Sequence, residues 1–207
     1  MKFTIGSLVL YIFILRHGET EADLLDVHEG RADFQLTKKG YLQASKIAKY
    51  ITNHYQPDVI ISSPMTRTRQ TTEHILRYCD TYVEFDERLM EWNNGVLAGM
   101  KRAEVMEKFP LPRNGRPLTE AIEEGESELA FRHRVEEVIF EMLEKHKDCH
   151  RILIVSHGGT ISHIMNILLN HSINEQVIFP TSDVGLHCIE IKNEKKIVHF
   201  VNSTLND

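Results

Sequence analysis

Two short segments of the sequence combine a histidine with groups able to bind an anion. The first is ILRHGET at residues 14–20, which contains Arg16 and His17, and the second is IVSHGGT at residues 154–160, where Gly158 follows His157. A guanidinium group presents a fork of N–H donors that suits phosphate oxygens. A neutral imidazole is a nucleophile near pH 7. One such histidine alone is more often a polar residue that ends a strand, but the repeated pattern favours a functional site.

Apolar runs rich in β-branched residues predict the strands that must carry these segments. They lie at residues 8–15, 58–62, 151–156 and 184–191, with a weaker run at 82–85. The first and third runs are nearly continuous, which is typical of strands covered on both faces. Helical patterns lie between or after them, at residues 37–51, 65–79, 127–146 and 159–170. This alternation predicts an α/β fold whose central sheet is mostly parallel and has helices on both faces.

The length of 207 residues favours one domain over two very small ones. Residues 110–125, PLPRNGRPLTEAIEEG, are rich in proline and glycine and interrupt the alternation of strands and helices. We therefore expect a single domain over residues 1–207 with a small loop or cap insertion around 92–126.

The ends of the predicted strands place the candidate residues near one another. In a mostly parallel sheet, ligands bind beyond the carboxyl ends of the strands. His17 and His157 each follow a strand directly, so they could face a single pocket. Glycine after each histidine would let the backbone approach a ligand. Arg67 and Arg69 follow the second strand in IISSPMTRTRQT and add two candidate cations.

Composition and charge narrow the class of protein. Apolar residues make up 42% and charged residues 26% of the chain, which is ordinary for a globular protein. A formal net charge of −6 argues against nucleic acid as a partner. The three cysteines are far apart and lack metal-site spacing, so a reducing, cytoplasmic location is expected. The apolar amino-terminal segment resembles a short signal peptide, but it lacks a cleavage site and is too short to span a membrane before Arg16 interrupts it.

Four segments in order give the sequence a recognisable family pattern. They are LRHGET, SSPMTRTRQT, RLMEWNNGVLAG and VSHGG, with a weaker match at GRADFQLTKKGYLQA. Together they resemble the histidine phosphatase superfamily, also called the phosphoglycerate mutase-like family, over about residues 8–200. Any one of these segments is a weak indication, whereas the four in this order are specific.

The resemblance implies a role for each matched residue. It makes His17 the nucleophile that accepts a phosphoryl group and Glu91 the proton donor to the leaving group. Arg16, Arg67 and His157 would bind the phosphate together with Gly158. The implied activity is that of a phosphoric monoester hydrolase of the histidine acid phosphatase type, acting on a small phosphorylated metabolite. It implies no metal ion and no cofactor, because the arginines would stabilise the developing charge.

Three positions depart from the family pattern. Asp23 stands where the family often has asparagine, so its carboxylate either points away from the phosphate or binds a hydroxyl or amine of the substrate. Trp92 and Asn94 stand where mutases of the family have an arginine and a tyrosine that bind phosphoglycerate. The departures at Trp92 and Asn94, and the short stretch between Glu91 and His157, favour hydrolysis over mutase activity. A mutase-type phosphotransferase and a catalytically silent module that binds a phosphorylated ligand stay as alternatives, and the sequence does not indicate the substrate or the oligomeric state.

Overall fold

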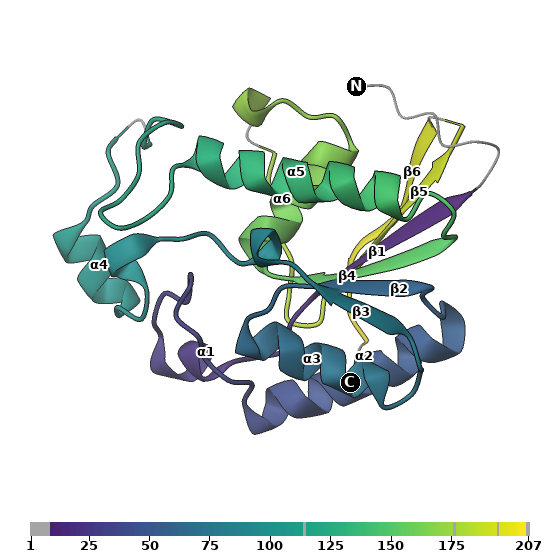
Figure 1. Ribbon diagram of the computed structural model, residues 1–207. Coiled ribbons are helices and arrows are strands. Elements are labelled where there is room, and N and C mark those ends of the chain that lie inside the picture. The colour runs from purple at the N-terminus through teal and green to yellow at the C-terminus, as the bar shows by residue number, and fades with distance from the viewer. Residues whose placement is uncertain (1–8, 114, 176, 194, 206–207) are drawn as a thin grey trace.

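The computed structural model describes residues 9–113, 115–175, 177–193 and 195–205. In this part of the chain six strands form one sheet in the order β3-β2-β4-β1-β5-β6 (Figure 1). The pairs β1–β4, β2–β4 and β2–β3 are parallel, whereas β5 runs antiparallel to β1 and to β6. The strands are β1 (Leu10–Arg16), β2 (Val59–Ser62), β3 (Tyr82–Phe85), β4 (Arg151–Ser156), β5 (Leu186–Lys192) and β6 (Lys195–Ser203). The mostly parallel α/β fold that the sequence predicts is therefore confirmed.

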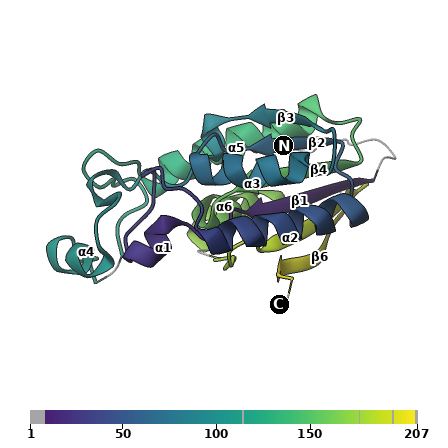
Figure 2. The ribbon, with the colours of Figure 1, turned by 90° about the horizontal axis from the view of Figure 1, so that it is seen from below.

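Helices cover both faces of this sheet, as the two views show (Figures 1 and 2). Along β1, Ile12 and Ile14 point into one core with α5 and α6, while Phe13 and Leu15 point into a second core with α2 and α3. Successive side chains of a strand point to opposite faces, so a strand covered on both faces has to be apolar throughout. The helices are α1 (Glu21–Leu25), α2 (Lys38–His54), α3 (Thr66–Leu76), α4 (Arg102–Lys108), α5 (Glu128–Lys145) and α6 (Gly158–Leu168).

The register of the parallel strands brings the two histidine segments together. Arg16 at the end of β1 faces Ser156 at the end of β4, so His17 and His157 occupy the next position on neighbouring strands. The backbone N–H of His17 donates to the carbonyl of Ser156 at 3.2 Å. On the other side of β4, Ser62 of β2 faces Val155. The loops after β1, β2 and β4 therefore meet at one edge of the sheet.

Several elements differ from the sequence-based prediction. The sequence analysis did not name β6, because its apolar run at residues 197–201 is short and interrupted by His199, and most residues of the strand are exposed. It did not predict α1 or α4 either, since five and seven residues are too few for a clear helical period. The predicted strand at 8–15 begins at Leu10, and residues 1–8 of the signal-like segment lie outside the described residues.

The insertion predicted around 92–126 contains α4. A short 3₁₀ helix, Gly95–Leu97, precedes α4, and residues 109–126 follow it. The described residues 109–126 form neither helix nor strand. In Figures 1 and 2, α4 and α1 lie at the same end of the molecule, beyond the carboxyl ends of the parallel strands. Backbone hydrogen bonds join them, from His28 N to Met100 O and from Arg102 N to Asp26 O.

Candidate active site

His17 is held as the tautomer that a nucleophile requires. Its ring is buried at the carboxyl end of β1, with a relative exposure of 1%. Nδ1 lies 2.8 Å from the carbonyl oxygen of Gly18. A carbonyl can only accept, so Nδ1 carries the proton and Nε2 keeps its lone pair. Burial and the positive charges of Arg67 and Arg16 hold the pKa of His17 well below its usual value, so the ring is neutral near pH 7.

Gly18 provides room for this arrangement in a way that the sequence did not indicate. A Cβ at Gly18 would lie 2.7 Å from the carbonyl oxygen of Gly40, in the first turn of α2. The amide of Gly18 donates to Thr71 Oγ1 at 3.3 Å. The glycine after the nucleophile thus permits a close contact between the loop and α2, where we had expected it to let the backbone approach a ligand.

His157 lies beside His17 and is fixed by two protein groups. The two ring centroids are 5.2 Å apart and the rings are nearly edge to face. Arg67 donates from Nε to Nδ1 of His157 at 3.1 Å, so the ring proton is on Nε2, which lies 2.8 Å from Ser63 Oγ. Burial and the charge of Arg67 keep the pKa of His157 well below its usual value. Both nitrogens are engaged by protein groups, and the contact of His157 with phosphate stays a prediction.

Arg67 is fully buried in the first turn of α3. Its two terminal nitrogens donate to the carbonyl oxygens of Ala32 and Gly30, at 3.0 and 2.8 Å. Of its five N–H groups, three are used in the contacts with Ala32, Gly30 and His157, so two are left for an anion. Burial lowers its pKa, partly offset by the carboxylate of Glu29. The cation is therefore both oriented and shielded from water.

Arg16 reaches the site from β1 and has one donor without a partner. Its terminal nitrogens contact the carbonyl oxygen of Thr181, at 2.8 Å, and the carboxylate of Asp183, at 3.4 Å. Its Nε is buried and makes no hydrogen bond in the structure. A Cβ built on Gly158 would lie 4.0 Å from this Nε, so the arginine passes close to the amino end of α6. An anion at this point would satisfy the unpaired donor.

Glu91 is bound to the amino end of α6. Its carboxylate accepts from the backbone N–H of Gly159 at 2.9 Å and of Thr160 at 3.1 Å. It also accepts from the N–H of Trp92 at 2.9 Å and from the Thr160 hydroxyl at 3.3 Å. A carboxylate in this position interacts favourably with the helix dipole. All four contacts use Glu91 as an acceptor, and Oε2 takes only one of them, so a proton on Oε2 would leave these contacts in place.

Asp23 and Trp92 bind groups other than the two histidines. Asp23 belongs to a capping box at the start of α1, where Oδ2 accepts from the backbone N–H of Thr20 at 2.9 Å. The indole of Trp92 donates to the carbonyl oxygen of Glu126 at 2.9 Å, and its ring stacks on Phe131 at 5.8 Å between centroids. The structure thus brings His17, His157, Arg16, Arg67 and Glu91 together, and directs Asp23 and Trp92 to other contacts.

Two residues that the sequence analysis did not name belong to the same cluster. Ser63 contacts His157, and Glu29 places Oε2 at 3.8 Å from His17 Nε2 and at 3.9 Å from Arg67 Nε. Ser63 lies in SSPMTRTRQT, and its position directly after β2 could have identified it as a residue of the site. Glu29 is one of 30 acidic residues in the chain and lies in a loop without periodicity, so only its position before the GRADFQLT segment pointed to the site.

The described residues offer neither a metal-binding cluster nor a membrane-spanning helix. They include no group of three or more His, Cys, Asp or Glu side chains placed to hold a metal ion. None of the helices they form is long and apolar enough to cross a lipid bilayer.

The comparison with known proteins identifies the family. A family model described as the histidine phosphatase superfamily (branch 1) matches residues 12–204. The chain therefore belongs to the histidine phosphatase superfamily, and the resemblance seen in the sequence is confirmed. The family match covers nearly all of the single domain that carries the site.

Individual relatives carry both phosphatase and mutase names. The chain is 26% identical over 196 residues to "Phosphoserine phosphatase 1" of Hydrogenobacter thermophilus, covering 93% of this chain and 92% of that protein. It is 34% identical over 170 residues to "Probable phosphoglycerate mutase GpmB" of Escherichia coli O1:K1, covering 78% of this chain and 75% of that protein. Among solved structures, the alpha-ribazole phosphatase of Shigella flexneri has a TM-score of 0.83 at 24% identity, covering 94% of this chain and 96% of that chain. At this identity the structural match supports the fold alone.

Proposed function

We propose that the protein hydrolyses a phosphate monoester of a small metabolite through a phosphohistidine intermediate, without a metal ion. The observation that carries this proposal is the state of His17. Its Nδ1–H is fixed on Gly18, so Nε2 keeps its lone pair, and burial with the charges of Arg67 and Arg16 holds the ring neutral, which is the state that a nucleophile requires.

In the first step, Nε2 of His17 forms a bond to phosphorus while the bond from phosphorus to the ester oxygen breaks. The leaving oxygen takes a proton, for which Glu91 is our candidate donor. In the second step, a water molecule attacks phosphorus and gives a proton to Glu91, the bond from Nε2 to phosphorus breaks, inorganic phosphate leaves, and His17 regains its lone pair. The division replaces one difficult displacement by two easier ones.

Arg16 and Arg67 supply the positive charge that phosphoryl transfer requires. Preorganised donors aimed at the phosphoryl oxygens are usually the largest contribution to catalysis of this reaction. The unpaired Nε of Arg16 and the two remaining N–H groups of Arg67 are the candidate contacts. Held by protein carbonyls, they need no reorganisation when the substrate binds.

Replacement of the nucleophile tests the proposal. We expect His17→Ala to abolish phosphate release from p-nitrophenyl phosphate while the thermal unfolding profile stays cooperative. Rapid quenching of the wild type at high pH should trap an acid-labile phosphohistidine, which His17→Ala should lack. The matched control is His133→Ala on α5, because the side chain of His133 is 72% exposed and contacts Glu137 on the same helix. Equal turnover by wild type and His17→Ala would refute the proposal.

A phosphoglycerate mutase activity is the second candidate, since the relative GpmB is 34% identical over 78% of this chain and carries a mutase name. Trp92 argues against it, because its indole is bound to Glu126 and stacked on Phe131 where a mutase of the family would offer a cation. An assay with 3-phosphoglycerate separates the two. Isomerisation faster than phosphate release would favour the mutase, and phosphate release alone would favour hydrolysis.

The same proposal includes the finer points that the sequence suggested. Residues 92–126 would act as a small cap over the leaving group. The cytoplasm would be the site of action, consistent with Cys79, Cys149 and Cys188, which are free thiols. A panel of phosphorylated metabolites assayed with the purified protein would identify the substrate class. A silent binding module predicts no turnover with any of them.

A further inference from the structure

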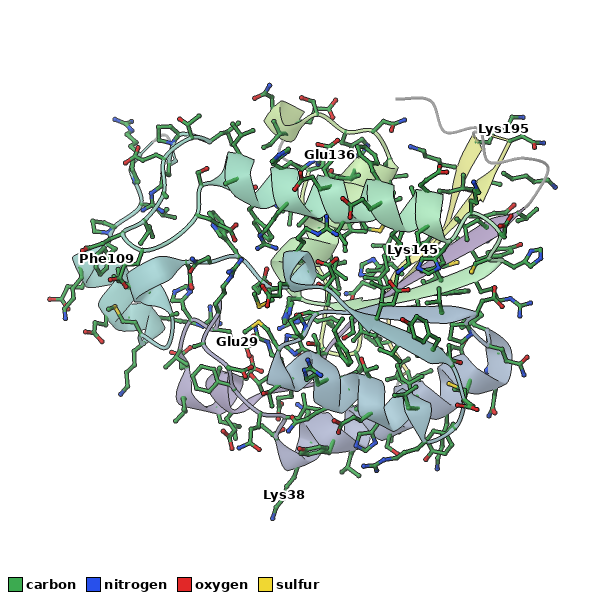
Figure 3. All side chains as sticks on the ribbon, in the orientation of Figure 1. Glu29, Lys38, Phe109, Glu136, Lys145 and Lys195 are labelled. Atoms are coloured by element: carbon green, nitrogen blue, oxygen red, sulfur yellow. The ribbon has the colours of Figure 1, made fainter. Side chains whose placement is uncertain are left out.

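Glu29 places a carboxylate inside the volume that a phosphoryl group must enter. Its Oε2 lies 3.8 Å from the attacking nitrogen of His17 and 3.9 Å from Nε of Arg67. Reacting atoms have to come within about 3–3.5 Å of each other, so phosphorus would stand closer to Nε2 than Oε2 does now. The side chain of Glu29 is 15% exposed, so little space is available for it to move aside into water. Figure 3 shows Glu29 between α1 and the body of the domain.

The other charges in the pocket determine how the carboxylate of Glu29 affects binding of a phosphate dianion. Arg67 and Arg16 are the two cations, and Arg16 is already paired with Asp183. Both histidines are neutral, because burial and the arginines lower the pKa of each. An ionised Glu29 would therefore repel the dianion that the arginines attract.

The hydrogen-bond partners of the other carboxylate oxygen of Glu29, Oε1, can accommodate one additional proton. Oε1 of Glu29 makes a short contact with the hydroxyl of Thr20, and the same hydroxyl lies 3.2 Å from Oδ2 of Asp23. One hydroxyl carries one hydrogen and can donate to only one of the two carboxylates. If Glu29 is protonated on Oε1, it donates to Thr20 and Thr20 donates to Asp23, so each contact becomes a proper hydrogen bond.

We propose that a phosphate group binds in this pocket together with one proton, which Glu29 takes up from the solvent. The proton neutralises the carboxylate nearest His17, no covalent bond breaks, and the proton returns to solvent when the anion leaves. Glu29 thereby makes binding of a dianion stronger as the pH falls. This inference rests on the proposed phosphate site. The titratable and charged groups facing Glu29 or the cations beside it come from several elements. They are Arg16 at the end of β1 with its partner Asp183, His17 directly after β1, Arg67 from α3, His157 at the start of α6, Asp23 from α1, and Asp33 and Glu91 from the loops.

Sulfate is the probe that tests this coupling, because it is a tetrahedral dianion without a titrating proton of its own in the range used. Its dissociation constant is measured by calorimetry from about pH 5 to about pH 8, on either side of the ordinary histidine value. For the wild type we expect binding to weaken by up to about tenfold per pH unit, as one coupled proton requires. Two buffers of different ionisation enthalpy give the number of protons taken up, which should approach one.

Glu29→Gln keeps the shape of the side chain and its contact with Thr20 but cannot titrate. We expect it to bind sulfate more tightly than the wild type above neutral pH, with little pH dependence and no proton uptake. Glu29→Ala should lose the same pH dependence, which separates the effect of charge from that of the new amide. The matched control is Glu144→Gln on α5, where the side chain is 75% exposed, and it should retain the wild-type slope.

Three outcomes would overturn the inference. Proton uptake that persists in Glu29→Gln would assign the proton to a histidine or to Asp183, whose carboxyl pKa is raised by burial. Equal sulfate affinity at every pH in the wild type would mean that Glu29 moves aside without a proton. Failure of wild type and Glu29→Gln to bind sulfate at any pH would mean that the pocket takes no tetrahedral dianion. Turnover of p-nitrophenyl phosphate on the same samples reports separately on the proposed function, since an active wild type with pH-independent sulfate binding contradicts only the role of Glu29.

Discussion

Nε of Arg67 donates to Nδ1 of His157 at 3.1 Å, and this hydrogen bond determines the state of both side chains. It fixes the proton of His157 on Nε2, directed at Ser63. It also aligns the guanidinium plane so that its terminal nitrogens bind the carbonyls of Ala32 and Gly30. The loop after β2, the loop after β4 and the segment before α2 are thus joined at one cation.

Arg67→Lys should therefore be far from conservative. A lysine ammonium has a single nitrogen and cannot bind His157, Ala32 and Gly30 with a planar fork. We expect kcat/KM for p-nitrophenyl phosphate to fall by about 10²- to 10³-fold, the usual effect of removing an oriented transition-state donor. Arg69→Lys is the matched control, because Arg69 lies two residues further along α3 and is exposed. If both variants lose activity equally, the buried fork is not the important feature.

Glu91→Gln separates proton donation from the structural role of this side chain. The amide oxygen can still accept from one backbone N–H of α6, but the NH2 group cannot accept from the other, and the side chain cannot give a proton to an alkoxide. With an alkyl phosphate we expect kcat to fall by about 10²- to 10⁴-fold, the usual range for general-acid catalysis. With p-nitrophenyl phosphate the loss should be much smaller, since that leaving group needs little protonation.

The control for this prediction is Glu124→Gln, which makes the same change at an exposed position of the insertion around 92–126. An equal loss of kcat with both substrates would indicate that Glu91 acts only by holding Gly159 and Thr160 in place. The alkyl and aryl esters should be compared at saturating concentration, so that the result reports kcat and not binding.

The pairing of His17 with His157 was predictable because it depends on short-range sequence signals. Each histidine directly follows an apolar run, and the carboxyl ends of parallel strands lie at the same sheet edge. The parallel sheet then required only the observed register of Arg16 with Ser156 to place the rings 5.2 Å apart. Arg67 followed from the same logic on β2.

Glu29 was not predictable, because its position depends on how a loop folds over the site. The loop between α1 and α2 has no periodicity, and an acidic residue there resembles any solvated carboxylate. Its place is set by tertiary contacts, through the carbonyl of Gly30 bound to Arg67 and through the Thr20 hydroxyl. The strand β6 was missed for a different reason: its apolar run at residues 197–201 is short and mostly exposed, and its pairing with β5 places it in the sheet.

Gly18→Ala tests the close contact between the nucleophile loop and α2. The new Cβ would lie 2.7 Å from Gly40 O and 3.1 Å from Gly40 Cα, which are backbone atoms that cannot rotate away. We expect a loss of about 1–3 kcal/mol in unfolding free energy, as for other overpacked positions, and a displaced His17. Urea unfolding measures the first effect and p-nitrophenyl phosphate turnover the second. Gly158→Ala gives the contrast in stability, since its Cβ would meet only Arg16 Nε at 4.0 Å; if it unfolds as readily as Gly18→Ala, the steric argument is wrong.

The buried histidines predict that the protein loses stability in acid. His187 accepts from the Asn202 N–H at 3.3 Å, its Nε2 lies 3.0 Å from the Thr181 hydroxyl, and burial lowers its pKa from 6.5 to about 4. The unfolded chain takes up the proton below about pH 6.5, whereas the folded protein does not until about pH 4. The stabilisation is therefore complete above pH 6.5 and is lost as the pH falls toward 4, with a slope approaching about 1.4 kcal/mol per pH unit. His17 and His157 act in the same direction.

Urea unfolding between pH 7.5 and pH 4.5 checks this slope, with His187→Gln as the diagnostic variant. The variant should be less stable than the wild type at neutral pH, because glutamine cannot reproduce both hydrogen bonds of the ring. Its unfolding free energy should nevertheless fall less steeply in acid. The slope should be smaller by about 1.4 kcal/mol per pH unit, the contribution of one proton. His133→Gln, at an exposed position on α5, should keep the wild-type slope. If His187→Gln and the wild type lose stability in parallel, His187 is not a source of the acid sensitivity, and the other buried histidines would have to account for all of it.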